Sequence, residues 1–206
     1  MSRFPQARFL VSAASPNQFP PDQGVEVAFA GRSNAGKSSA INAITGRSGL
    51  ARASKTPGRT RLLNFFELAL HRRIVDLPGY GFASAPQEDR ERWLPLLERL
   101  RARRALRGMI LVVDARRGLM EGDRMLIDWA ASDRRVLHVL LSKVDKLNRA
   151  ESQRVLSQTR SALADRGSVQ AFSATRGTGV ETAQQVLDSV FATKDPDDLG
   201  EIAGAD

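Results

Sequence analysis

A glycine-rich segment from Gly31 to Ser38 constrains the fold of this 206-residue chain more than any other feature. It follows an apolar run over residues 25–30 and leads into a segment of helical character. Glycines let the backbone approach phosphate oxygens, and successive N–H groups at a helix N-terminus form an anion-binding concavity. In such a loop Lys37 places its charge on the terminal phosphates, and the Ser38 hydroxyl ligates Mg2+. The pattern predicts a phosphate-binding P-loop; the alternative is a glycine turn before an ordinary helix.

The composition excludes several other classes of protein. The chain has no cysteine, which rules out a disulfide framework and a cysteine-based metal site or nucleophile. We expect its two histidines, His71 and His138, to be surface or strand residues. No apolar stretch approaches the roughly 20 residues of a membrane span, and the run over residues 9–14 is shorter than a signal-peptide core. We therefore expect a cytoplasmic protein that begins with a partly ordered arm.

Charge is unevenly distributed along the chain. The net charge is +8, but residues 194–206 set Lys194 against five acidic residues, a net of −4, so the remainder carries +12. Such an excess favours a polyanionic partner, nucleic acid above all, although many soluble proteins are merely basic. We expect three parts: an N-terminal arm (1–22), a central domain that contains the P-loop (23–193) and an acidic, disordered tail (194–206).

Apolar runs alternate with segments of helical spacing along the chain. Six strands are predicted, over residues 25–30, 62–70, 73–76, 109–114, 136–141 and 169–172. Helical stripes lie between them, and their apolar positions include Trp93, Leu96, Leu97 and Leu100; Met125, Trp129 and Ala130; Val155, Leu156, Thr159 and Leu163; and Ala183, Val186, Leu187 and Val190. The pattern predicts an α/β fold of the P-loop NTPase type, a mostly parallel six-stranded sheet with helices on both faces.

A second candidate motif stands at the end of the third predicted strand, Asp76-Leu77-Pro78-Gly79. A carboxylate there can hold the hydration shell of Mg2+, and the Gly79 N–H can reach a γ-phosphate. A strand that ends in a plain turn would have the same sequence, so both interpretations stay open.

Two further segments suit recognition of a guanine base. After the fifth predicted strand, Asp145 of Ser142-Lys143-Val144-Asp145 can accept hydrogen bonds from guanine N1–H and its exocyclic amine. Adenine offers neither donor there, so the same carboxylate would reject it. The Lys143 stem can lie along the base, and Phe172-Ser173-Ala174 can supply N–H groups to the guanine carbonyl.

The longest stretch without clear periodicity covers residues 47–61 and contains Lys55-Thr56-Pro57-Gly58-Arg59-Thr60. Loops of this length in compact domains are usually functional or disordered. A threonine on such a loop can reach Mg2+ when γ-phosphate is present and release it after hydrolysis. Thr56 and Thr60 both qualify by chemistry.

Taken in order, these motifs resemble the EngB (YihA/YsxC) family of bacterial GTPases, within the TrmE-Era-EngA-EngB-Septin-like superfamily of Ras-like domains. The resemblance rests on residues 31–38, 55–60, 76–81, 142–145 and 172–174 and spans roughly residues 5–193. Its specific part is the pair Lys-Thr-Pro-Gly-Arg-Thr (55–60) and Asp-Leu-Pro-Gly-Tyr-Gly (76–81). The one departure is Ser142, where the family usually has threonine, and either hydroxyl can serve.

The resemblance implies a GTP- and Mg2+-binding protein that acts in late assembly of the large ribosomal subunit and is needed for normal cell division and septation. It makes Ser38 and Thr60 the Mg2+ ligands, with Asp76 acting through water. The residues expected to line the nucleotide are Gly31, Arg32, Ser33, Asn34, Ala35, Gly36, Lys37, Ser38, Gly58, Arg59, Thr60, Arg61, Leu62, Asp76, Leu77, Pro78, Gly79, Ser142, Lys143, Val144, Asp145, Phe172, Ser173 and Ala174.

The expected catalytic residues are Lys37, Thr60, Gly79 and Asn34. Where Ras-like proteins carry a water-orienting glutamine, this chain has Tyr80, so hydrolysis should be slow. Related GTPases with an asparagine at the position of Asn34 hold K+ near the phosphates; the alternative for Asn34 is a loop-capping role.

Two basic runs are candidates for contact with ribosomal RNA, and a solvated basic face is the alternative for each. The first comprises Arg47, Arg52, Lys55, Arg59, Arg61, Arg72 and Arg73; the second comprises Arg99, Arg101, Arg103, Arg104 and Arg107. We expect a monomer. Two other functions remain open: a P-loop ATPase or kinase, and an RNA-binding module in which the nucleotide is structural.

Overall fold

A computed structural model describes residues 3–51, 62–80 and 95–193 of the chain. Its elements follow in chain order: β1 (Arg8–Ala13), a 3₁₀ turn (Pro16–Gln18), β2 (Val25–Gly31), α1 (Lys37–Thr45), β3 (Leu63–Ala69), β4 (Arg72–Asp76), a helix over residues 95–101, β5 (Leu106–Asp114), α3 (Glu121–Ser132), β6 (Val136–Ser142), a second 3₁₀ turn (Val144–Lys146), α4 (Arg149–Leu163), β7 (Ser168–Ala171) and α5 (Val180–Phe191). This alternation confirms the predicted α/β fold.

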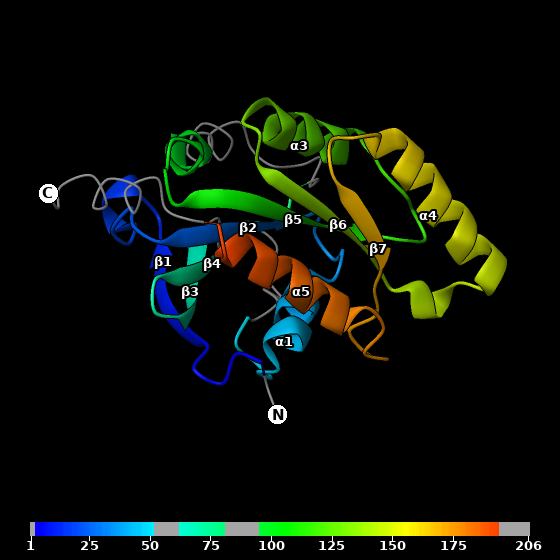
Figure 1. Cartoon of the computed structure of the whole chain (residues 1–206), viewed down its shortest axis with the longest axis horizontal. Helices are drawn as coiled ribbons and strands as arrows, with labels where there is room; N and C mark the ends of the chain where they lie inside the picture. Colours follow the sequence, from blue (N-terminus) through cyan, green and yellow to red (C-terminus); the bar gives the residue numbers. More distant parts are fainter. Residues whose placement is uncertain (1–2, 52–61, 81–94, 194–206) are drawn as a thin grey trace, which may run out of the picture.

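The strands form one sheet in the order β1-β3-β4-β2-β5-β6-β7 (Figure 1). The neighbours from β4 to β7 run parallel, whereas β3 is antiparallel to both β1 and β4. The predicted count of six strands is wrong by one, because β1 lies inside the segment interpreted as an arm. That apolar run is too short to be predicted as a strand from its own sequence. It forms a strand because the edge of β3 offers backbone hydrogen bonds to it.

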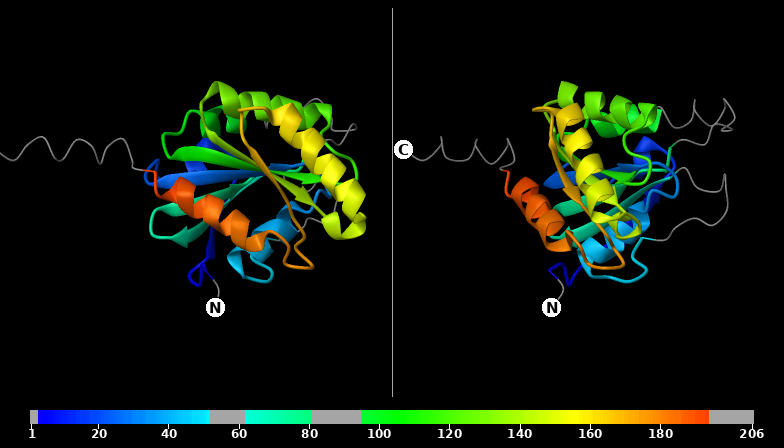
Figure 2. Two further views of the ribbon diagram at one scale, coloured as in Figure 1. Left: turned by 45° about the vertical axis from the view of Figure 1, so that its right-hand side comes forward. Right: turned by 90° about the vertical axis from the view of Figure 1, so that its right-hand side faces the viewer.

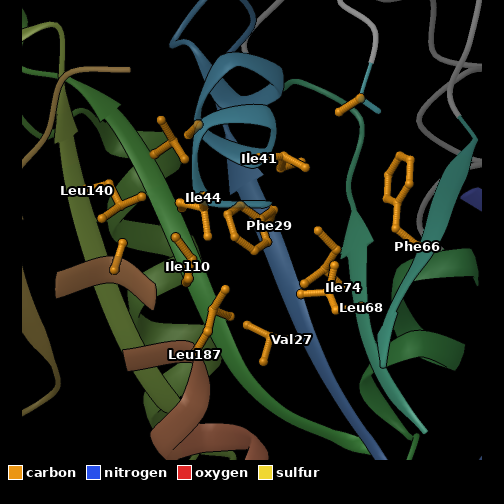
Figure 3. Close-up of a cluster of buried hydrophobic side chains, with 14 of the residues drawn as sticks. Val27, Phe29, Ile41, Ile44, Phe66, Leu68, Ile74, Ile110, Leu140 and Leu187 are labelled. Carbon is orange, nitrogen blue, oxygen red and sulfur yellow. The ribbon is translucent and has the colours of Figure 1, made fainter. Parts of the chain in front are cut away.

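Helices cover both faces of the sheet, with α1 and α5 on one face and α3 on the other (Figures 1 and 2). Alternate residues of β2 point to the two sides: Val27 and Phe29 join the core under α1 and α5, whereas Ala28 and Ala30 join the opposite core. Figure 3 shows the first of these cores around Phe29. Burial on both sides explains why the central strands read as continuous apolar runs.

The helical stripes at the C-terminal end of the chain are confirmed. Val155, Thr159 and Leu163 are buried on α4, and Ala183, Leu187 and Val190 on α5. The stripe assigned to α3 is partly wrong: Ala130 is buried as predicted, but Met125 is 68% exposed, and the helix buries Asp123 and Ile127 in addition to Ala130. Trp129 is half-buried beside the core, and Trp93 lies outside the described residues.

Three members of the two basic runs bind acidic side chains within the fold. Glu26 on β2 is fully buried and accepts hydrogen bonds from Arg73 Nε at 2.9 Å and Arg103 Nε at 2.7 Å. Arg101 binds Asp133 on the loop after α3. Arg73 and Arg103 are buried and therefore cannot form an exposed RNA-binding face, whereas Arg101 holds elements together from a side chain that is 36% exposed.

The remaining described members of the first run lie away from the predicted nucleotide loops. Arg72 pairs with Val25 at the start of β2, and Arg47 follows the C-terminus of α1. Both therefore sit at the edge where the parallel strands begin, opposite the P-loop. The other members of this run, Arg52, Lys55, Arg59 and Arg61, lie outside the described residues.

Candidate nucleotide-binding site

The predicted motifs gather at one edge of the sheet, where its parallel strands end. Gly31 is the last residue of β2, Asp76 of β4 and Ser142 of β6, and Phe172 follows β7 directly. Ligands of open α/β sheets bind outside the carboxyl ends of the strands, so this edge is the candidate site. The fold alone brings together segments that lie more than 100 residues apart in the sequence.

The glycine-rich segment forms a tight loop around the N-terminus of α1. Gly36 is the helix N-cap with φ 96°, and Asn34 has φ 62°, so both adopt the left-handed conformation. Gly31 is needed for close packing, because a Cβ atom there would lie 2.6 Å from the Val112 carbonyl oxygen. The first amides of α1 thus face the mouth of a loop that lies directly against the sheet, as phosphate binding requires.

Lys37 and Asp76 form an ion pair beneath this loop. Their side chains are only 11% and 8% exposed. Burial raises the pKa of the Asp76 carboxyl above its usual range, and the charge of Lys37 and hydrogen bonds from Lys37 and Asn64 offset part of that increase. The pair brings together the two residues predicted to serve the phosphates and the Mg2+ hydration shell. Ser38 follows Lys37 in the first turn of α1.

Asn64 is a site residue that sequence reasoning missed. It stands opposite Asp76 in the β3–β4 register, and its carbonyl oxygen accepts a hydrogen bond from Ser12 Oγ at 2.6 Å. A short polar chain therefore runs from β1 through β3 to the carboxylate of Asp76. An asparagine inside a mostly apolar strand was the available signal, but only the register shows what it touches.

Asp145 and Ser173 meet at the far end of the site. The Asp145 carboxylate accepts a hydrogen bond from Ser173 Oγ at 2.6 Å, and this bond lowers the pKa of the carboxyl. The two segments also join through their backbones, because Val144 N–H donates to the Phe172 carbonyl at 3.3 Å. The residues predicted to read the base are thus brought together, with the carboxylate held in its charged form.

Ser142 and Lys143 connect this base-reading end to the P-loop. Ser142 Oγ donates to the Ala35 carbonyl at 2.5 Å, and Lys143 Nζ donates to the Asn34 carbonyl at 2.5 Å. Lys143 also binds Asp114 Oδ2 at 2.9 Å. Burial alone would raise the pKa of Asp114, but hydrogen bonds from Arg116 and Lys143 reverse this effect and hold the pKa well below its usual range. Asp114 was predicted only as a strand end, and its position after an apolar strand was the signal.

The segment after Asp76 continues alongside the P-loop. Leu77 N–H donates to the Phe29 carbonyl at 2.9 Å, and Ser33 N–H donates to the Tyr80 carbonyl at 3.0 Å. Gly79 lies so close that a Cβ atom there would be 3.0 Å from Ser33 Cα. The Tyr80 hydroxyl donates to Asp123 of α3, a buried partner that sequence reasoning did not identify. Gly79 and Tyr80 are thus placed directly against the phosphate-binding loop.

Several predicted site residues fall outside the described part of the chain. These are Thr56, Gly58, Arg59, Thr60 and Arg61. Among the other predicted residues, Leu62 immediately precedes β3, Pro78 is half-buried, and Ala174 packs beside the core under α1 and α5. Within the described ranges no cluster of three His, Cys, Asp or Glu side chains could hold a metal ion.

A P-loop at the head of a doubly wound sheet, with an ion-paired lysine and aspartate beneath it, defines a P-loop GTPase fold. Two family models match the chain: the 50S ribosome-binding GTPase model over residues 26–143 and the elongation factor Tu GTP-binding domain model over residues 96–193. The first of these covers more than half of the chain and includes the P-loop, Asp76 and the start of the Ser142–Asp145 segment.

Close relatives and a solved structure give a more specific assignment. The chain is 46% identical over 195 residues to the probable GTP-binding protein EngB of Coxiella burnetii strain CbuK_Q154, covering 93% of this chain and 95% of the relative. It is 47% identical over 192 residues to the EngB protein of Azoarcus sp. strain BH72, covering 91% and 92%. A crystal structure of a probable GTP-binding protein engB superposes with a TM-score of 0.65 at 25% identity, covering 81% of this chain and 98% of that one.

The chain belongs to the EngB family of GTP-binding proteins, and it is a GTPase. A structure of Era from Aquifex aeolicus shares the fold with a TM-score of 0.58 at 19% identity, covering 81% of this chain and 57% of that one. Over the described ranges, no helix has the length and apolar character needed to cross a bilayer.

Proposed function

We propose that this GTPase is a nucleotide-controlled switch in late assembly of the large ribosomal subunit, and that its role in cell division and septation follows from that work in the cytoplasm. The observation that carries the proposal is the match of residues 26–143 to a 50S ribosome-binding GTPase model. Support comes from the site, where one edge of the sheet holds a phosphate loop at one end and a charged carboxylate, Asp145, at the other.

The residues at the P-loop fit Mg2+, which prefers hard oxygen ligands and keeps several waters. Ser38 would supply its hydroxyl and Asp76 would hold a metal-bound water, with Thr60 as the proposed second ligand. Bound there, the ion would neutralise charge that develops on the phosphates. Lys37 reaches the same place, and Asp76 orients its ammonium group under the loop.

Hydrolysis is proposed to be slow, because the side chain after Gly79 does not orient water. Tyr80 has no amide, and its hydroxyl is already bound to Asp123. A K+ ion beside Asn34 is proposed as the compensating charge. The Asn34 residue is exposed on the loop, and its carbonyl accepts from Lys143. Equal GTPase rates in K+ and in Na+ would exclude this part of the proposal.

Guanine selectivity opposes the alternative of a P-loop ATPase or kinase. The hydrogen bond from Ser173 lowers the pKa of Asp145 further below its usual range, and a charged acceptor at this position repels the acceptor N1 of adenine. The other alternative is an RNA-binding module in which the nucleotide is structural. It relies on the same basic surface as the proposed switch, so only an experiment can distinguish the two.

Contact with RNA is proposed at the edge that also holds the nucleotide loops. A groove between the β5–α3 connection and α4 is lined by Arg116, Arg117 and Arg154, with Glu151 as its acidic member. Glu151 is engaged in capping α4 through the Asn148 N–H. Phosphate contacts from such side chains would make affinity depend on salt.

The test measures binding of the monomeric protein to purified large ribosomal subunits, loaded with GDP or with a non-hydrolysable GTP analogue, over a KCl series. We expect tighter binding with the analogue, and the double variant Arg117→Ala/Arg154→Ala should lower the salt slope by about 2. A matched pair at the opposite edge and the far end of α4, Arg72→Ala/Arg160→Ala, should leave the slope unchanged. Equal binding in both nucleotide forms would favour the structural-nucleotide alternative.

A further inference from the structure

Tyr80 joins three parts of the molecule that surround the phosphate end of the site. Its backbone pairs with the P-loop, since Tyr80 N–H donates to the Gly31 carbonyl at 3.4 Å and its own carbonyl accepts from Ser33 N–H at 3.0 Å. Its side chain reaches the first turn of α3, where the hydroxyl donates to Asp123 Oδ1. Gly79, immediately before it, is exposed but lies close to Ser33 of the P-loop.

Asp123, the partner of Tyr80, is buried and uses both of its carboxylate oxygens in hydrogen bonds. The residue is only 1% exposed, although it is an aspartate on a surface helix. Its second oxygen, Oδ2, accepts a hydrogen bond from Met120 N–H at 2.8 Å and so caps the start of α3. Burial raises the pKa of both Asp123 and Tyr80. Because both carboxylate oxygens are used, Tyr80 is held to a part of α3 that is itself fixed.

Two neighbouring residues complete the contact. The Tyr80 ring lies against the backbone of Gly122, where a Cβ atom would be 3.1 Å from ring atoms Cδ2 and Cε2. Only glycine leaves room for the ring at this distance. Arg32 of the P-loop reaches across to the Met120 sulfur, so a second link runs from the P-loop to the same turn of α3.

We propose that Asp123 is a positioning residue that selects GTP over GDP: through Tyr80 it holds Gly79 where its N–H meets the γ-phosphate. The inference rests on the γ-phosphate role proposed for Gly79. GDP lacks that phosphate and makes no contact with Gly79. Without the Tyr80–Asp123 hydrogen bond, Gly79 and Tyr80 would have to be ordered when GTP binds. The free-energy cost of that ordering would weaken the binding of GTP but not of GDP.

A purely structural role for Asp123 makes a different prediction. If the buried hydrogen bonds only stabilise α3, their loss lowers the free energy of unfolding and weakens both nucleotides equally. The informative quantity is therefore the ratio of the GTP-analogue and GDP dissociation constants, measured alongside the thermal unfolding midpoint.

The experiment compares full-length wild type, Tyr80→Phe, Asp123→Ala, Asp123→Asn and the double variant Tyr80→Phe/Asp123→Ala by titration with a non-hydrolysable GTP analogue and with GDP in Mg2+. We expect Asp123→Ala to weaken the analogue about tenfold, the factor that about 1.4 kcal/mol represents, with GDP affinity changed less than about twofold. Tyr80→Phe should weaken binding of the analogue by a similar factor, because loss of the hydroxyl breaks the same hydrogen bond. Asp123→Asn should recover most of it, because its amide can still hydrogen-bond Tyr80.

The double variant should lose no more than either single variant, because the two residues act through one contact. Asp128→Asn is the matched control: Asp128 lies on the same helix but binds Arg166 at the surface, and its ratio should equal that of the wild type. An unchanged ratio in Tyr80→Phe, or additive losses in the double variant, would overturn the proposal even if Asp123→Ala fails to fold. Gly79→Ala distinguishes the proposed role of Gly79 from the proposed role of the Tyr80–Asp123 hydrogen bond. If Gly79→Ala changes the ratio of dissociation constants but Tyr80→Phe does not, only the role of the hydrogen bond is rejected. If Gly79→Ala leaves the ratio unchanged, the role of Gly79 itself is rejected.

Discussion

Asp145 illustrates how one hydrogen bond can favour the charged form that a proposed role requires. Ser173 Oγ donates to Oδ1 of its carboxylate, and this bond is the main reason that the pKa of the carboxyl lies below its usual range. The pKa stays far below neutrality, so the group remains a charged acceptor under physiological conditions. Lys146 lies 3.7 Å from the other oxygen and favours the same charged form.

We expect Asp145→Asn to change the base that the protein prefers. The amide can donate one hydrogen bond to the xanthine oxygen, but it loses a charged acceptor that two guanine donors require. Affinity for GTP should fall at least about 100-fold, and affinity for xanthosine triphosphate should rise above it. Isothermal titration with both nucleotides measures the exchange. Asp165→Asn, an exposed aspartate just beyond α4, should bind both as the wild type does. Retained GTP affinity in Asp145→Asn would show that this carboxylate does not read the base.

For single residues, the sequence predicted those that belong to short local motifs. It missed residues that contact these motifs from other strands or helices. Lys37, Ser38, Asp76 and Asp145 stand in local patterns that each imply a role. Asn64, Asp114 and Asp123 were missed because their partners lie on other strands or helices, so only the sheet order and register bring the atoms together.

The elements are joined at their N-terminal edge by a buried charge cluster. Glu26 of β2 lies between Arg73 of β4 and Arg103, which precedes β5, and all three are almost fully buried. Arg103 also donates to the Pro20 and Pro21 carbonyls and lies over the rings of Phe19 and Phe65. A cluster of this kind is destabilising when one partner is removed, because the remaining charges are left buried and unpaired.

We therefore expect Glu26→Ala to lower the free energy of unfolding by about 3–5 kcal/mol. Glu67→Ala is the control, because Glu67 is also a strand glutamate paired with an arginine, but its partner Arg8 is 66% exposed. That exposed pair should contribute less than about 1 kcal/mol. Urea unfolding at neutral pH measures both variants. If both variants lost a similar free energy of unfolding, water or a local rearrangement would have to satisfy the charges of Arg73 and Arg103 in Glu26→Ala.

Predictability at the scale of elements follows from how many sides of an element are buried. The central strands are covered on both faces, so β2, β5 and β6 appear as continuous apolar runs and were predicted within a few residues of their ends. The edge strand β1 is half-exposed and has an ambiguous pattern. The α3 stripe was misjudged because Asp123, a buried polar residue, occupies a position that hydrophobic periodicity assigns to an apolar side chain.

Across the whole molecule, the N-terminal residues bind regions that are distant in sequence. Arg3 pairs with Asp188 of α5, the Ala7 carbonyl accepts from Arg47 Nε at 3.2 Å, and Asp22 accepts from the Ala105 N–H at 2.9 Å. Phe4 and Ala7 enter the core shared by α1 and α5. The sequence of this segment did not predict these contacts, because each one depends on an element that comes much later in the chain.

This arrangement makes the stability of the GTPase fold depend on residues near its N-terminus. Phe4 is 6% exposed inside the core, whereas Phe9, on β1, is 52% exposed and packs against Phe66 in an edge-type arrangement with a ring-centroid distance of 5.8 Å. Truncating a buried phenylalanine removes its burial and leaves a cavity, so Phe4→Ala should cost about 3 kcal/mol. Phe9→Ala should cost about 1 kcal/mol or less, since much of its surface already meets water. Thermal and urea unfolding of both variants give the comparison, with GDP affinity as a check that each remains folded at the start. Equal stability of Phe4→Ala and the wild type would show that the core under α1 and α5 closes without the segment before β1.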